Sequence, residues 1–169
     1  MTRRNAITIA AVAVAAAAVL GWVLVMSFFD GYVIPSEANT PTLQPGDRVL
    51  TRPLGDRDVE RGELVVYSLP GEPGPNQHIG RVAAVGGDAV SAEQGSLVID
   101  GDVVDEPYLP ESTFTDGLDV IEVPDGHVLV LGDNRAHAAD SRSFGTLPVE
   151  QIEGLVATRW WPVNRIGGV

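Results

Sequence analysis

The sequence runs Gly132-Asp133-Asn134-Arg135 and, after four further residues, Asp140-Ser141-Arg142-Ser143-Phe144-Gly145. The first group is typical of a tight turn, because Asp and Asn side chains can hydrogen-bond their own backbone. Asp140 and Arg142 lie two residues apart, so they can form an ion pair that braces the base of a site. A surface ion pair alone contributes little to stability, but the whole string is too specific for an ordinary surface turn.

Around this string the sequence consists of short β-like segments separated by loops rich in Gly and Pro. Strands are predicted at residues 48–51, 63–68, 79–85, 96–99, 103–104, 120–123, 128–131 and 153–160. Asp-Gly at 100–101 is a strong hairpin-turn signal, and a second Asp-Gly lies at 125–126. Only residues 149–152 predict a short helical turn. Many short, closely spaced strands indicate one all-β domain, with no room for a second.

An apolar run precedes this domain. Residues 6–29 form 24 consecutive positions without a charge, and as a helix they would reach roughly 36 Å, enough to cross a bilayer core of about 30 Å. Arg3 and Arg4 precede the run and Asp30 follows it. The positive-inside bias therefore places the N-terminus in the cytoplasm and the domain outside.

A cleaved signal peptide is the alternative for this run, since Ser36-Glu37-Ala38 has the small-x-small pattern of a cleavage site. The run is much longer than the roughly 7–15 apolar residues of a signal peptide, which favours an uncleaved anchor. A buried soluble helix is disfavoured because the run has no polar face. In a bacterial-type cell membrane we expect a single-pass protein with three parts: a cytoplasmic N-terminus at 1–5, a transmembrane signal anchor at 6–29 and an extracytoplasmic domain at 30–169.

The domain is strongly acidic. From residue 30 onward, nine arginines stand against 23 acidic residues, a formal charge of −14. Such a surface repels nucleic acid and anionic lipid, and it keeps an Ala/Val/Gly-rich domain soluble. The chain has no cysteine, which excludes disulfides and thiolate metal sites. The three histidines, at 78, 127 and 137, lack metal-ligand spacing, so we expect no metal and no cofactor.

Four segments that cover most of residues 33–160 resemble, in order, the conserved boxes of type I signal peptidases. These S26-family enzymes are membrane-anchored serine endopeptidases with a serine nucleophile and a lysine base. The first segment reads Pro35-Ser36-Glu37-Ala38-Asn39-Thr40-Pro41-Thr42-Leu43, against Pro-Ser-x-Ser-Met-x-Pro-Thr-Leu in the family. Residues 61–67, residues 79–88 and the string quoted above supply the other three. The resemblance implies coiled antiparallel β-sheets that carry a shallow peptide groove, tethered by one N-terminal transmembrane helix.

The same comparison shows what this chain lacks. Ala38 occupies the nucleophile position, Gly80 the lysine position and Ala138 the position of a serine that orients the lysine. All eleven basic residues of the chain are arginines, so no lysine can take over. A desolvated lysine has a lowered pKa and can accept the serine proton, whereas glycine has no side chain to do so. We therefore predict that the chain is inactive by the usual mechanism.

Other family positions are kept, and the resemblance assigns them to the groove and its support. They are Pro35, Ser36, Asn39 (in place of methionine), Pro41, Asp133, Asn134, Arg135, Asp140, Ser141 and Arg142. In the family the groove holds a small-x-small signal segment as an added strand. The expected partners are therefore the membrane, signal peptides of exported proteins or an active signal peptidase.

Two alternatives stay open. Ser36 lies two residues before Ala38, and His78 lies two before Gly80, so on alternating strands each keeps the face of the lost residue. A relocated Ser36–His78 pair would make the chain an active signal-peptide endopeptidase. Against this, active family members also keep a serine at this position as a helper, and His78 follows a Pro/Gly loop. The other alternative is a structural membrane protein with a relic fold.

Overall fold

The computed structural model describes residues 12–21, 23, 30–69, 71 and 76–169. The chain divides into two compact units, Met1–Asp30 and Gly31–Val169. In the first unit the described residues 12–21 and 23 are helical. Within the described part of the chain, no helix is both long enough and apolar enough to span a membrane. Much of the predicted anchor, at 6–11, 22 and 24–29, lies outside the described residues.

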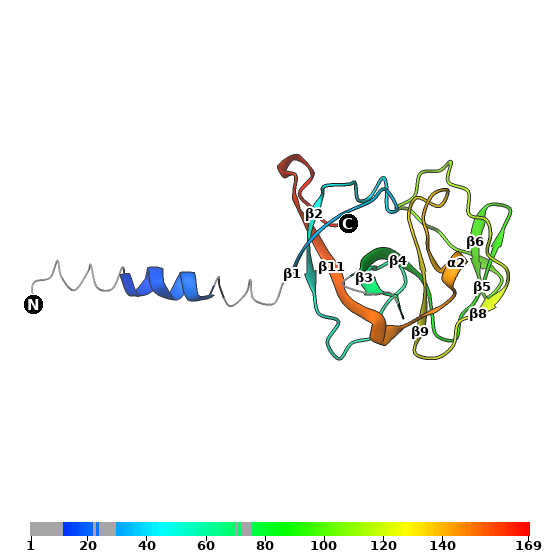
Figure 1. Cartoon of the computed structure of the whole chain (residues 1–169), viewed down its shortest axis with the longest axis horizontal. Coiled ribbons are helices and arrows are strands. Elements are labelled where there is room, and N and C mark those ends of the chain that lie inside the picture. The colour runs from blue at the N-terminus through cyan, green and yellow to red at the C-terminus, as the bar shows by residue number, and fades with distance from the viewer. Residues whose placement is uncertain (1–11, 22, 24–29, 70, 72–75) are drawn as a thin grey trace, which may run out of the picture. The chain divides into compact units, whose positions relative to one another are not determined.

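The second unit is built on a seven-stranded sheet (Figure 1). Its strands are β1 (Asp30–Val33), β2 (Arg48–Arg52), β3 (Leu64–Ser68), β4 (Gln77–Val85), β9 (His127–Leu131), β10 (Leu147–Pro148) and β11 (Ile152–Trp161). They lie in the order β1-β2-β11-β3-β4-β9-β10, and β2 through β10 pair antiparallel. The ten-residue β11 joins the two halves of the sheet, because it pairs with β2 and with β3.

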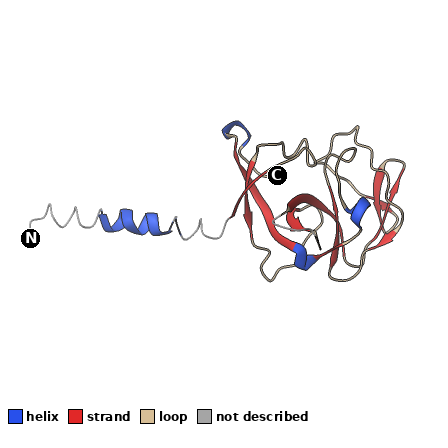
Figure 2. Cartoon of the chain, viewed as in Figure 1, coloured by secondary structure: helices blue, strands red, loops and turns tan. Residues whose placement is uncertain are grey.

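A smaller four-stranded sheet lies at the end of this unit away from β1 and β2 (Figure 1). Its strands, in the order β7-β6-β5-β8, are β5 (Ala89–Glu93), β6 (Ser96–Ile99), β7 (Asp102–Val103) and β8 (Ile121–Glu122). Short helical segments follow the strands (Figure 2): α2 (Ser141–Phe144), η1 (Val149–Gln151) and η2 (Val163–Arg165).

Alternate side chains of β9 pack into two different core clusters, one of which includes residues of the small sheet. Val128 and Val130 point into a core cluster shared with β3 and β11, whereas Leu129 and Leu131 point into a second cluster. The second cluster contains Val90, Leu97 and Ile99 of the small sheet. Because neighbouring side chains on a strand face opposite ways, one strand serves both cores. The end of β9 is thereby fixed from both faces, and the quoted Gly132 string begins there.

The prediction of a mainly β, antiparallel domain is confirmed, and so is the Asp100-Gly101 hairpin. Both turn residues have positive φ, at 54° and 90°, and they join β6 to β7. The second Asp-Gly turn differs, because β8 and β9 on either side of it belong to different sheets. Several elements were not predicted, namely β1, β5, β10, α2 and η2.

Candidate functional site

Three segments of the chain meet at Gly132, directly after β9. A Cβ built on Gly132 would lie 2.3 Å from the Ala138 Cβ and 2.5 Å from the Ala38 carbonyl oxygen. A Cβ built on Gly80 would lie 3.4 Å from the carbonyl oxygen of Leu131, the residue before Gly132. The structure therefore brings close together Ala38, Gly80 and Ala138, the three residues that the resemblance assigns to the positions of nucleophile, base and orienting serine. The side chains at these positions are the methyl groups of Ala38 and Ala138 and the hydrogen atom of Gly80.

The space at residue 80 is already filled. A Cβ on Gly80 would lie 2.4 Å from Cγ1 of Val130 and 3.5 Å from Cε1 of Tyr67. Val130 is fully buried, and a β-branched side chain has little freedom at χ1. Val130 therefore occupies the space that a side chain would need at residue 80, the position that the resemblance assigns to the base.

A cavity of about 290 Å³ lies beside these positions. It is formed by the loop after β1, by β3 and β4, and by the turn after β9. Ile34 and Ile79 give it apolar walls, and both are buried. Its lining residues are Ile34, Pro35, Ser36, Glu37, Ala38, Asn39, Tyr67, Gln77, His78, Ile79, His137 and Ala139.

Hydrogen bonds hold the loop that carries Ala38 from two sides. Asn39 is 2% exposed, and its Nδ2 donates to the Ile79 carbonyl on β4 at 2.8 Å. From the other side, the backbone N–H of Asn134 donates to the Ala38 carbonyl at 3.0 Å, and the side-chain Nδ2 of Asn134 donates to the Glu37 carbonyl at 3.1 Å. The loop is thus a fixed wall of the cavity.

Ser36 and His78, the predicted alternative pair, both line this cavity. Ser36 Oγ accepts a long hydrogen bond of 3.5 Å from the Ala38 amide. His78 stacks on Tyr67, with ring centroids 5.5 Å apart and planes 26° apart. A third polar side chain, His137, was not predicted at the site. Its Nδ1 lies 3.2 Å from Asn134 Oδ1. The available signal was its place next to Ala138, between Arg135 and Asp140.

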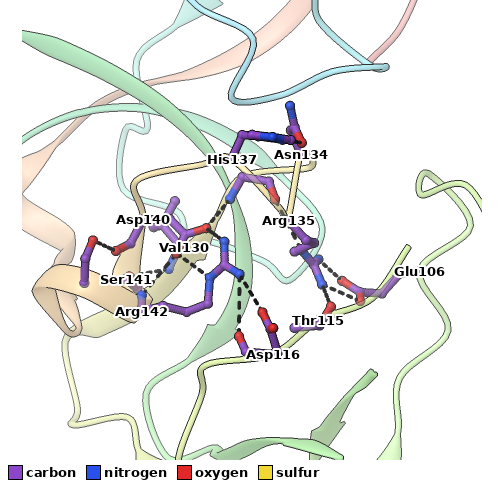
Figure 3. A network of polar contacts seen from close by, with 12 residues as sticks. Glu106, Thr115, Asp116, Val130, Asn134, Arg135, His137, Asp140, Ser141 and Arg142 are labelled. Atoms are coloured by element: carbon purple, nitrogen blue, oxygen red, sulfur yellow. Dashed lines mark hydrogen bonds and ion pairs between the residues drawn. The ribbon is translucent and has the colours of Figure 1, made fainter. Parts of the chain in front are cut away.

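The predicted Asp140–Arg142 ion pair is present (Figure 3). Nε and Nη2 of Arg142 each lie 2.8 Å from the Asp140 carboxylate, and this hydrogen bonding raises the pKa of the guanidinium. Asp140 also caps α2 and accepts the Gly132 amide at 3.0 Å. Ser141 Oγ accepts the Val130 amide at 2.9 Å. The pair therefore braces the Gly132 turn through its backbone.

The side chains of the turn itself bond outward, unlike the prediction that they satisfy their own backbone. Asp133 forms a buried bidentate ion pair with Arg81 at 2.8 and 2.7 Å, and Asn134 bonds the Glu37 carbonyl. Arg135 reaches Glu106 and Thr115 (Figure 3), and only its Nε returns to the Gly132 carbonyl, at 3.2 Å. The turn is therefore fastened to its surroundings by its side chains.

Tyr108, which was not predicted, closes this network. Its ring lies 3.9 Å from the Arg81 guanidinium carbon, and its hydroxyl donates to Glu106 at 2.6 Å. Burial raises the pKa of Tyr108, and the bond to Glu106 raises it further. Pro41 lies apart from the cavity, in a neighbouring pocket lined also by Asp133, Asn134 and Arg135.

Comparison with known proteins gives consistent matches. The family model "Signal peptidase, peptidase S26" matches residues 5–161. A probable signal peptidase I-2 of Synechocystis is 36% identical over 140 residues, covering 79% of this chain and 64% of the relative. Signal peptidase IB of Staphylococcus aureus is 31% identical over 172 residues, covering 90% of this chain and 88% of the relative.

Among solved structures, a signal peptidase I from Enterococcus faecalis is 22% identical with a TM-score of 0.49, covering 60% of this chain and 98% of that one. The family model spans most of the sequence, and the S. aureus relative aligns over nearly its whole length. The chain therefore belongs to the signal peptidase family, peptidase S26.

Proposed function

We propose that this chain is a non-catalytic member of the signal peptidase family that binds signal-type peptides in its cavity. Ala38 has no hydroxyl to attack a carbonyl, Gly80 has no group to accept a proton, and Ala138 has none to orient one. Losing a nucleophile or base of a serine protease costs on the order of 10⁶-fold in kcat. Beside these positions, the cavity is open and has Ile34 and Ile79 as apolar walls.

The observation that carries this proposal is the contact between Gly80 and Val130. A site that had lost only its catalytic side chains would leave a gap at residue 80, but Val130 Cγ1 occupies that space. The cavity between the Ile34 and Ile79 walls stays open beside it. This combination favours retention of binding over retention of catalysis.

The proposal includes the predicted organisation of the chain. Residues 6–29 would anchor it in a bacterial-type membrane with the N-terminus inside, and residues 30–169 would form the extracytoplasmic domain. Anchoring of this kind would keep the cavity near the membrane, where signal peptides emerge. An active signal peptidase is the other partner that such a placement favours.

A cleavage and binding assay tests the proposal. The full chain in detergent is incubated with a signal-peptide substrate, and products are followed by mass spectrometry. We expect no cleavage above the rate without protein, and we expect a photoreactive peptide to label the loop at Ala38. Labelling that is absent at saturating peptide would favour the relic-fold alternative.

A second function is favoured by one observation, that Ser36 and His78 line the same cavity. In that case the chain is an active endopeptidase with a relocated pair. Cleavage that disappears on Ser36→Ala and on His78→Gln, in folded variants, would establish this function and overturn the non-catalytic proposal.

A further inference from the structure

We propose that the cavity binds the free C-terminal carboxylate of a peptide that ends in a small residue, rather than an uncut chain. Such an acid is the product of endoproteolytic cleavage after a small residue, so a peptidase must act before this protein. The inference rests on the proposed peptide-binding function and narrows its ligand. It follows from the donors that line the cavity and from the missing nucleophile.

Two donors lie at the nucleophile position. The hydrogen bond from the Ala38 backbone N–H to Ser36 Oγ is long, at 3.5 Å, so Ser36 competes only weakly with a better acceptor for this N–H. Ser36 Oγ is the acceptor in that contact, which leaves its own hydrogen to donate. A backbone N–H and a hydroxyl two residues apart suit the two oxygens of one carboxylate.

A histidine, His137, also lines the cavity. Asn134 Nδ2 donates to the Glu37 carbonyl, so its Oδ1 is the acceptor that faces His137 Nδ1 at 3.2 Å. Nδ1 of His137 therefore carries a hydrogen. His78 lines the same cavity.

Ala38 makes room for the extra oxygen. A serine there would place its hydroxyl oxygen against the carbonyl carbon of the bound residue, where the second oxygen of an acid must lie. The Ala38 methyl group presents no lone pairs, so the repulsion between oxygens is absent. An alanine in place of the serine nucleophile thus makes the site more favourable for a peptide with a C-terminal carboxylate, which is the product of peptide-bond cleavage.

The ionisable residues around the cavity are Glu37, Tyr67, His78 and His137. Glu37 is exposed to solvent, where screening weakens its repulsion of a ligand carboxylate. The acidic domain disfavours polyanionic ligands, but one terminal carboxylate makes short hydrogen bonds that outweigh this distant charge. Ile34 and Ile79 accept the small apolar side chain beside it.

The test compares three peptides of one sequence that ends in Ala-x-Ala. The first has a free C-terminal acid, the second a C-terminal amide, and the third continues for four residues. Binding to the full chain in detergent is measured by fluorescence anisotropy, and mass spectrometry verifies that the third stays intact. We expect the acid to bind about tenfold more tightly than the other two, the usual margin of charge-assisted over neutral hydrogen bonds.

Variants assign the effect to the cavity. We expect Ser36→Ala to reduce the advantage of the acid several-fold. Ser91→Ala is the matched control, because Ser91 lies on β5 outside the cavity, with its Oγ near the Glu93 carboxylate. It should leave all three affinities as they are.

The outcomes separate this inference from the proposed function. Equal affinity for all three peptides, competing for one site, would overturn carboxylate binding and leave peptide binding standing. An acid advantage that persists in Ser36→Ala would also overturn it. Absence of binding by all three, in a protein shown to be folded by circular dichroism, would overturn both.

Discussion

Gly80 and Val130 show at the level of single atoms how the site has adapted to a missing side chain. On β4 the residue before Arg81 faces the core cluster of β3, β9 and β11, and a Cβ there would overlap Val130 Cγ1. A glycine in a strand normally weakens it, because no side chain packs there. Here the neighbouring valine supplies that packing.

We expect Gly80→Ala to lower the free energy of unfolding by about 1–3 kcal/mol, because it overpacks a closed core. Urea denaturation of the domain measures this. Gly31→Ala is the control, since a Cβ on Gly31 would meet nothing within 4 Å. If Gly80→Ala is as neutral as the control, Val130 moves aside freely and the space is not closed.

The Arg81–Asp133 pair leads to a second prediction. Both side chains are almost fully buried, at 4% and 0% exposed. Asp133→Ala should therefore cost about 3–5 kcal/mol, since it leaves a guanidinium charge unpaired in the interior. Denaturation of both variants compares it with Glu60→Ala, which breaks an exposed pair with Arg57 and should cost less than about 1 kcal/mol.

A small loss in Asp133→Ala would mean that water or Glu106 compensates Arg81. Glu106 is a candidate because Tyr108 contacts both Glu106 and Arg81. That result would indicate that Tyr108 contributes more to the free energy of unfolding than the Arg81–Asp133 ion pair does.

Among the elements, strand positions followed from alternation and turn residues, because these are local properties of the sequence. Residues 64–68 and 128–131 were predicted almost to the residue. Other elements depend on partners far away in sequence. The short β10 exists because Leu147 pairs with Val128, and α2 begins where Asp140 accepts backbone and guanidinium hydrogens.

The segment 104–120, between β7 and β8, is an element without regular structure that tethers the site. Tyr108→Phe removes the hydrogen bond to Glu106 and should destabilise the segment by about 1–2 kcal/mol. Tyr108→Ala also removes the contact with Arg81 and should cost about 1 kcal/mol more. Hydrogen exchange of residues 104–120 and of the Gly132 turn measures both.

We expect hydrogen exchange at the Gly132 turn to rise in Tyr108→Phe and to rise further in Tyr108→Ala. If exchange rises only within 104–120 and the Gly132 turn stays protected in both variants, Tyr108 stabilises its own segment and not the site.

For the whole molecule, the resemblance assigns Ala38, Gly80 and Ala138 to one site. In the structure Ala38 and Ala138 lie against Gly132, and Gly80 lies near the carbonyl of Leu131, the residue before it. The cavity, the overlap with Val130 and the position of Tyr108 were not predictable. Each depends on side-chain orientations and on segments that meet only in the folded chain. Motifs record spacing along the sequence, whereas the Val130–Gly80 and Tyr108–Arg81 contacts join residues 50 and 27 positions apart.

The proposed anchoring gives a prediction at this scale. In intact cells whose outer layers have been made permeable, added protease should degrade the domain at residues 30–169, while an N-terminal tag stays protected. Carbonate washing should leave the full chain with the membrane fraction, because about 24 apolar residues suffice to span it. Protection of the domain from protease, with digestion only after lysis, would show the opposite orientation.

The contact between Val130 and residue 80 also bears on whether single substitutions could restore hydrolysis. Under the non-catalytic proposal, Gly80→Lys alone would meet a filled core and lose stability, and it would give no hydrolysis while Ala38 lacks a hydroxyl. Ala38→Ser alone would supply a hydroxyl without a lysine base. On this proposal neither single substitution leads to hydrolysis, and packing against Val130 opposes the one at residue 80.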